Sequence, residues 1–270
     1  ISEITKTSTD KEIQNEWLVT ENNLSGLYML KGETKKSRDI QKKTFEKCVE
    51  LYGENDLTCL VQMVSLGVAE ISFNLENAKN ILEKFLTLEP KTNLEFLRTR
   101  VNARATLGVI YSELGNQKKG EELALEAVNL IDPTDSRFRQ AYIYAMNDYY
   151  FFLMKSGKVK EPIEGYIELL NLVDKNFGTT DSLKTHLLNN LGFGYAMLGK
   201  NDLALETYLE GEKIASIYLS EKKTLANLQL NIADSYFWRA DMKKSLEYSL
   251  KALKNVNHLL PIGKITLYSR

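Results

Sequence analysis

One residue pattern recurs along this chain at a step of 41 or 42 positions, and that step constrains the fold more than any other feature. The clearest copies are the segments 107–115 (LGVIYSELG) and 191–199 (LGFGYAMLG). Their closing glycines, Gly115 and Gly199, lie 84 positions apart, which is twice 42, and Gly157 lies midway between them. An internal period of this length indicates an array of stacked supersecondary units.

The register extends over almost the whole chain. With each unit taken to begin fourteen residues before its closing glycine or equivalent, the units begin near residues 18, 59, 101, 143, 185 and 226. The predicted repeat region covers residues 12–260. Residues 1–11 are polar and rich in Thr and Ser, so we expect an N-terminal tail or linker there, and residues 261–270 are predicted to be a C-terminal tail. Because the first residue is Ile1 rather than Met, we expect a processed form or an excised domain.

Each unit is predicted to be a pair of antiparallel helices. The first half of a unit has apolar residues at helical spacing, as in Leu187, Leu188 and Leu191. A glycine, or Ala240 in the last unit, then ends the helix, because the turn needs a residue that tolerates positive φ. The second half repeats the helical period and ends in a polar break such as the one at Pro133. We therefore expect about twelve helices in six pairs, forming one elongated domain with one continuous core.

The composition excludes several classes of function. The sequence is 43% hydrophobic and 26% charged, which is typical of a folded soluble protein. Its net charge of −1 gives no support for nucleic-acid binding. No uninterrupted apolar stretch approaches the ~20 residues that a membrane span requires, so we expect no membrane insertion within this chain.

No catalytic or metal-binding constellation is recognisable. The two histidines and two cysteines do not have zinc-ligand spacing, and the motifs of metalloproteases, α/β-hydrolases and P-loop proteins are absent. The segment 192–194 (GFG) resembles the start of a dinucleotide-binding loop, but it lies inside a helical segment with no preceding strand. We therefore expect no enzyme activity, no metal and no cofactor.

The two cysteines, Cys48 and Cys59, flank the predicted turn at Gly53. If two helices fold back at that glycine, the cysteines lie at nearly equal height, and a disulfide is geometrically possible. The alternative is a pair of buried free thiols. A disulfide would indicate an oxidising compartment such as a periplasm, and hence an extracytoplasmic domain of a membrane-anchored receptor; a cytoplasmic protein is the alternative.

Asparagine recurs at one phase of the pattern. Asn23, Asn190 and Asn231 occupy the sixth place of their units, and Asp148 occupies it in the fourth unit. An amide offers a donor and an acceptor to an extended peptide backbone, so recurrence at one phase predicts a ladder of ligand-binding groups along one surface. The alternative is that these amides satisfy turns or contacts between helices.

Aromatic residues, Tyr144 among them, fall at or beside phases that share the face of the ladder. Amides combined with aromatic side chains are typical of a peptide-recognition surface, although core packing is the alternative for any single ring. The predicted ligand-binding residues are Asn23, Asn147, Asp148, Phe151, Asn189, Asn190, Phe193, Asn231, Phe237 and Trp238.

The unit resembles the tetratricopeptide repeat (TPR). The residues that carry the resemblance in the third unit are Leu107, Gly108, Tyr111, Gly115, Ala124, Ala127 and Pro133. That family repeats every ~34 residues; the longer step here resembles the variety found in kinesin light chains and in many bacterial signalling proteins, as do the segments 51–56 (LYGEND) and 187–192 (LLNNLG). The resemblance covers nearly residues 12–260, and it is poorest in the first and fourth units, where Tyr149-Tyr150 replaces Leu-Gly.

The resemblance implies an all-α, right-handed superhelical solenoid whose first helices line a concave groove for peptides, often with an asparagine on the ligand backbone. By position these are Asn23, Asn190 and Asn231, whereas Asp148, Val64 and Thr106 depart from the pattern. The implied function is that of a non-catalytic domain that binds a protein or peptide, as the sensor or scaffold part of a signalling protein. The alternatives are a cytoplasmic receptor for short signalling peptides fused to a DNA-binding module, and an accessory domain of an enzyme that lies outside this chain.

Overall fold

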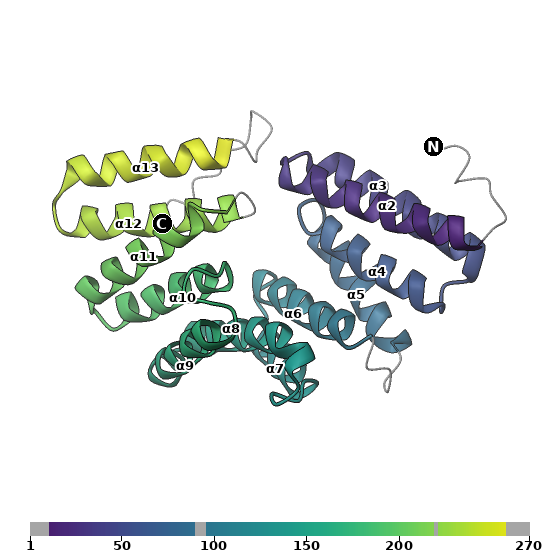
Figure 1. Ribbon diagram of the computed structural model, residues 1–270, viewed down its shortest axis with the longest axis horizontal. Helices are drawn as coiled ribbons and strands as arrows, with labels where there is room; N and C mark the ends of the chain where they lie inside the picture. The colour runs from purple at the N-terminus through teal and green to yellow at the C-terminus, as the bar shows by residue number, and fades with distance from the viewer. Residues whose placement is uncertain (1–10, 90–95, 219–220, 258–270) are drawn as a thin grey trace. The chain divides into compact units, whose positions relative to one another are not determined.

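The structure, a computed structural model, describes residues 11–89, 96–218 and 221–257, and all its regular elements in these ranges are helical (Figure 1). The helices are α2 Lys11–Leu30, α3 Thr34–Tyr52, α4 Leu57–Glu70, α5 Leu75–Leu88, α6 Leu97–Glu113, α7 Gln117–Asn129, the short 3₁₀ helix η1 Ser136–Phe138, α8 Arg139–Lys155, α9 Lys160–Asn176, α10 Leu183–Met197, α11 Asn201–Ala215, α12 Lys222–Trp238 and α13 Met242–Asn257. The prediction of an all-α fold of about twelve helices in sequential pairs is confirmed. Of the two predicted tails, all but Lys11 lies outside the described residues.

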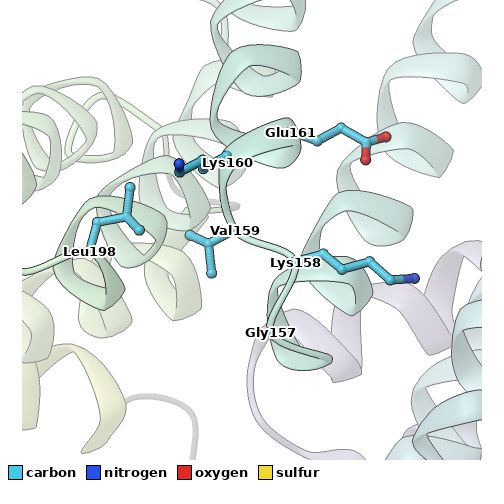
Figure 2. Close-up of a pocket in the computed structure, with 6 residues that line it drawn as sticks. All are labelled: Gly157, Lys158, Val159, Lys160, Glu161 and Leu198. Carbon is cyan, nitrogen blue, oxygen red and sulfur yellow. The ribbon is translucent and has the colours of Figure 1, made fainter.

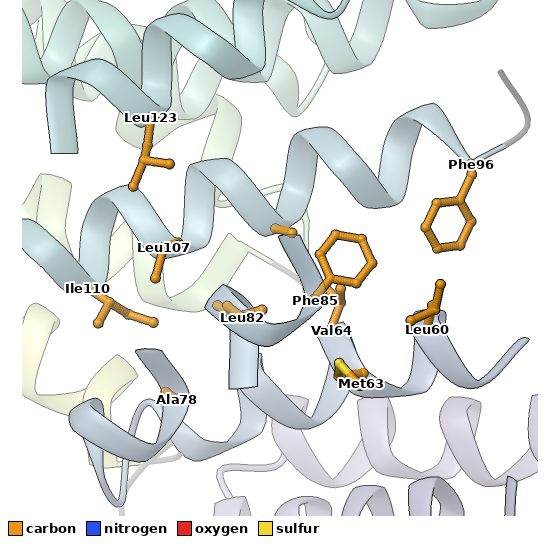
Figure 3. Close-up of a cluster of buried hydrophobic side chains, with 11 residues drawn as sticks. Leu60, Met63, Val64, Ala78, Leu82, Phe85, Phe96, Leu107, Ile110 and Leu123 are labelled. Atoms are coloured by element: carbon orange, nitrogen blue, oxygen red, sulfur yellow. The ribbon is translucent and has the colours of Figure 1, made fainter. Parts of the chain in front are cut away.

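The chain divides into two compact units, residues 1–141 and 142–270. In the first unit each helix from α2 to α7 packs against the next. Its main apolar cluster is drawn from α4, α5, α6 and α7, with Phe85 and Phe96 as its largest members and their ring centroids 5.8 Å apart (Figure 3). The amphipathic faces predicted from the helical period supply this core.

In the second unit, successive helices from α9 to α13 pack against each other, and α8 joins them through ring contacts. The Tyr150 ring of α8 lies 5.5 Å from that of Tyr166 in α9, centroid to centroid. One buried cluster surrounds Tyr166 and a second surrounds Tyr208 on α11. The core of this unit is therefore a series of clusters between neighbouring helices, as expected of stacked units.

The turns between paired helices adopt the backbone conformation that the sequence predicts. Gly32, Gly115, Gly157 and Gly199 all have positive φ, and Ala240 has a φ of 59° at the equivalent place; the α4–α5 turn is the exception. Only glycine reaches this region without a steric penalty, which explains why four of these five turns end in glycine.

A disulfide links α3 to α4. Cys48 and Cys59 have a Cα–Cα separation of 5.5 Å, and both side chains are buried beside Trp17 and Leu18 of α2. The bridge therefore joins the second helix of one unit to the first helix of the next, on either side of the turn at Gly53.

Candidate functional site

Four asparagines of the second unit form a hydrogen-bonded chain across three helices. Asn231 Nδ2 on α12 donates to Asn189 Oδ1 on α10 over 3.0 Å, and Asn190 Nδ2 donates to Asn147 Oδ1 on α8 over 2.9 Å. Within the helices, Asn189 Nδ2 donates to Asn190 Oδ1 and Asn147 Nδ2 donates to Asp148 Oδ1. We call this set of five residues the amide chain.

The repeat explains the geometry of the amide chain. Asn147 and Asn189 occupy the fifth place of successive units, and Asn190 and Asn231 the sixth. The sixth-place amide of each first helix donates to the fifth-place amide of the unit before it. The contact between helices that the sequence left as an alternative is therefore present.

The amide chain uses only part of its hydrogen-bonding capacity. Each carboxamide has two N–H donors and an oxygen with two lone pairs. Within the amide chain, Asn189 and Asn190 each use one donor and one acceptor. Both side chains are half-buried, whereas Asn147 is buried. Beyond these bonds Asn189 keeps one donor and one lone pair, whereas the Asn190 amide also interacts with the Tyr166 hydroxyl.

Asp148 is the acceptor at the end of the amide chain. Burial raises the pKa of its carboxyl to about 6, while the hydrogen bond from Asn147 and the charge of His186 act in the opposite direction. The Tyr166 hydroxyl donates to the Asn147 backbone oxygen over 2.8 Å and fixes α8 at this level of the stack. The ionised carboxylate therefore lies in an environment that partly disfavours its charge.

Two pairs of rings flank the amide chain. Tyr144 lies one turn before Asn147 on α8 and meets His186 of α10 edge to face, with centroids 6.2 Å apart. Phe151 lies one turn after Asn147 and meets Phe193, also at 6.2 Å. Side chains three or four positions apart share a helix face, so the rings and amides form one continuous surface.

His186 is a site residue that sequence reasoning missed. Its Nε2 lies 3.3 Å from a carboxylate oxygen of Glu221, which also accepts a hydrogen bond from Thr185 Oγ1 over 3.1 Å. Chiefly through the hydrogen bond from His186, the pKa of Glu221 is lowered. The available signal was the spacing, because His186 follows Tyr144 by 42 positions and so occupies the same place in its unit.

The amide chain leads into an open cleft of about 1200 Å³ formed by α10, α11 and α12. Four predicted ligand-binding residues line it, namely Phe193, Asn231, Phe237 and Trp238. Phe237 is 51% exposed and Trp238 80% exposed, with their rings perpendicular and 5.7 Å apart. Exposed rings of this size, adjacent in a cleft, are more typical of a binding surface than of a core.

The cleft contains further residues that the sequence did not single out. Met197, Tyr208 and Asp234 line it together with the predicted residues. Met197 precedes Trp238 by 41 positions, so the period could have identified it. Tyr208 comes from a second helix, and no first-helix pattern could place it in the cleft.

A smaller cavity of about 400 Å³ lies at the turn between α8 and α9 (Figure 2). Val159 and Leu198 face each other across it, while Lys158 and Glu161 extend away from them. With few apolar groups and no set of converging polar ones, this cavity is a weaker candidate than the cleft.

The other predicted residues are placed as follows. Asn147, Asp148, Asn189 and Asn190 belong to the amide chain, and Phe151 to a ring pair, all outside the lining of the cleft. Asn23 is an exposed residue of α2 in the first unit, and its ligand-binding role stays a prediction.

Among the residues that the structure describes, no cluster of three or more histidine, cysteine or acidic side chains could hold a metal ion. No helix in the described ranges has the length and apolarity to cross a bilayer.

Comparison with known proteins identifies the fold. No family model and no curated protein matches the chain. Solved structures similar to it include the apo form of RapI (TM-score 0.68, 15% identity, 94% of this chain and 89% of that one) and a Rap protein complexed with Competence and Sporulation Factor (0.67, 14%, 93% and 66%). A putative kinesin light chain from Podosopora anserina with nearly identical TPR-like repeats also matches (0.57, 15%, 74% and 94%). The chain is a TPR-like repeat domain by its fold.

Proposed function

We propose that this chain is a non-catalytic domain that binds an extended peptide or protein segment on the face formed by α8, α10 and α12, as the sensor or scaffold part of a signalling protein. The observation that carries the proposal is the amide chain, which lies between two ring pairs and leads into a cleft with exposed Phe237 and Trp238.

The chemistry of this face fits a peptide. An extended backbone presents alternating donors and acceptors, and the half-buried Asn189 keeps one of each kind beyond the bonds of the amide chain. The rings of Phe193, Phe237 and Trp238 offer apolar area for ligand side chains in the cleft. Aromatic anchors combined with a few fixed polar groups are the usual composition of a recognition site.

A receptor for short signalling peptides is the second candidate. It is favoured by the similar Rap structure that was solved with Competence and Sporulation Factor bound. In that case the output module, such as a DNA-binding domain, lies outside this chain. Both candidates use the same face and differ only in what is attached to it.

The test is a selection of random peptides against the immobilised chain, followed by fluorescence titration of the enriched sequences. The chain has two tryptophans, of which Trp17 is buried and Trp238 is exposed in the cleft. In a Trp17→Phe background the emission reports on Trp238 alone. We expect selected peptides to shift this emission to shorter wavelength, because binding removes the indole from water.

Variants then locate the binding surface. Trp238→Ala should weaken binding by about 30-fold, as expected for an aromatic anchor worth about 2 kcal/mol, and Asn231→Ala should weaken it less. Because Trp238→Ala removes the fluorescent reporter, the affinity of that variant is measured by calorimetry. Asn190→Ala is unsuitable, since it removes the donor to the buried Asn147 Oδ1 and costs stability as well. Ile217→Ala, an exposed apolar residue outside the cleft, is the matched control.

If no peptide is enriched, or if the enriched peptides bind Trp238→Ala and Asn231→Ala as tightly as the parent, the proposal is wrong.

A further inference from the structure

The last described helix carries an apolar stripe over which no described residue packs. Met242, Leu246 and Leu250 lie four residues apart on α13, and Leu246 and Leu250 are 62% and 56% exposed. Residues at this spacing share one face of a helix. Three large apolar side chains on one exposed face are typical of a helix that packs against a partner through that face.

The repeat shows what this stripe is for. On α11, Leu205 and Leu209 stand 41 positions before Leu246 and Leu250, and both pack into the cluster shared with α12. On α9, Ile163 occupies the same place and packs in the cluster shared with α10. In the α9–α10 and α11–α12 contacts, then, the place of Leu246 on the second helix is covered by the first helix of the next unit, whereas Ile167, at the place of Leu250 on α9, is 42% exposed. On α13 the face is the same and the following first helix is missing from the described residues.

The first described helix shows the complementary face. Leu24 and Leu27 of α2 stand 167 positions before Leu191 and Gly194 of α10, as Gly32 stands before Gly199. Leu191 is buried in the cluster with Ile163, and a Cβ built on Gly194 would lie 3.0 Å from Ile163 Cγ1. These are the places where a first helix receives the second helix of the preceding unit. On α2 the corresponding leucines are 38% and 57% exposed.

The charges beside the two faces are opposite. Lysine occupies four positions on α13 and glutamate one, and Lys251 and Lys254 lie in its second half. On α2, Glu16 lies in the first half and Glu21 just past the middle. In the equivalent α11–α12 contact, Gln229 donates to Glu212 over 3.0 Å. The corresponding positions are Leu253 on α13 and Glu21 on α2, so Lys254 would lie next to Glu21 in such a contact.

We propose that these faces bind each other between two copies of this chain, with α13 of one copy packed against α2 of the next as α11 packs against α12. Both faces have the apolar positions that the repeat uses for this contact, and their charges are complementary. The interface is heterologous, because each copy contributes a different surface, so association proceeds head to tail.

The experiment is sedimentation equilibrium of the full chain and two double variants. Leu246→Glu/Leu250→Glu destroys the α13 face and leaves α2 intact; Leu24→Glu/Leu27→Glu does the reverse. We expect the mass of the parent chain to rise with concentration, and each variant alone to associate at least about tenfold more weakly, because a buried charge without a partner is costly. An equimolar mixture of the two variants should form dimers and nothing larger, since each partner has one working face.

Ile217→Glu is the matched control, because Ile217 is as exposed as Leu246 but lies on neither face, and this variant should associate like the parent. Circular dichroism of every variant checks that the helices are retained. A zero-length cross-link between Lys254 of one isotopically labelled copy and Glu21 of an unlabelled copy would identify the contact directly.

Three results would overturn the proposal. The first is a parent chain that is monomeric at every concentration. The second is a dimer of Leu24→Glu/Leu27→Glu with itself, which would show that α13 pairs with α13. The third is association that appears only in a chain ending at Asn257, which would make residues 258–270 the occupant of the α13 face.

Discussion

The polar residues of the amide chain show what a single sequence can predict at the scale of residues. The period placed Asn190 and Asn231 at one phase and Asn147 and Asn189 at the place before it. It could not predict that the amides donate in one direction toward Asp148, because that depends on the relative height of neighbouring helices. A phase gives the face of a helix, whereas a hydrogen bond requires distances of about 3 Å to be right.

Asp148 gives a testable dependence of stability on pH. Burial raises the pKa of its carboxyl from 3.8 to about 6, so the folded state binds this proton more tightly than the unfolded state does. The resulting contribution to stability is complete below about pH 4 and is lost as the pH rises through about 6. Asp148→Asn keeps an oxygen for the Asn147 donor and carries no charge. At about pH 8 we expect this variant to have a free energy of unfolding about 1–2 kcal/mol above that of the parent.

Urea unfolding of both proteins at a series of pH values measures this difference, which should disappear below about pH 4. The pH-dependent contributions of other titratable groups cancel in the difference, because these groups are common to both proteins. In a His186→Gln background the difference should persist, since burial is the largest cause of the raised pKa. A difference that is independent of pH, or a variant that is less stable at about pH 8, would contradict the assignment.

At the scale of elements, the sequence was most informative where backbone geometry restricts the residue type. The turn glycines were predicted from their spacing, and Gly199 has the positive φ that its position requires. The close approach between α10 and α11 uses the small residue Gly192, whose partner is the ring of Tyr208. That partner could not be predicted, because which side chain fills a gap depends on the packing of the neighbouring helix.

Gly192 provides a test of this helix contact. A Cβ added at Gly192 would lie 2.5 Å from Tyr208 Cε1, and the ring is buried in its own cluster. Alanine favours a helix over glycine by about 1 kcal/mol, but overpacking costs about 1–3 kcal/mol. Gly192→Ala should therefore lower the free energy of unfolding, as measured by urea denaturation, although it raises the intrinsic helix propensity.

Gly26 on α2 is the matched control, because a Cβ built there meets nothing within 4 Å. Gly26→Ala should raise the free energy of unfolding by about 0.5–1 kcal/mol through helix propensity alone. Equal effects of the two substitutions would show that the contact between Gly192 and Tyr208 does not limit the approach of α10 and α11.

At the scale of the whole molecule, the period predicted the number and order of the helices but not how the chain divides. One continuous core was expected, and the structure gives separate clusters around Phe85, Tyr166 and Tyr208 within two compact units. Each helix of a repeat array contacts mainly its neighbours. Local differences in packing decide where such an array divides, and the predicted extent of the domain stays a prediction.

The division predicts that the second unit folds by itself. The clusters around Tyr166 and Tyr208 consist of residues from Tyr142 to Tyr248, and so does the amide chain. A fragment of residues 136–270 contains all of them. We expect it to show a helical circular dichroism spectrum and a single cooperative thermal transition, because its apolar faces remain paired within the fragment.

A fragment of residues 183–270 is the matched control. It lacks α8 and α9, so Leu187 and Leu191 lose their packing contacts with Tyr166 and Ile163. Removing that layer should give a less cooperative transition and a midpoint lower by several degrees, since each unit is stabilised by its neighbours. If both fragments melt alike, the cluster around Tyr166 does not hold the second unit together. If the longer fragment has no cooperative transition, the second unit depends on the first for its fold.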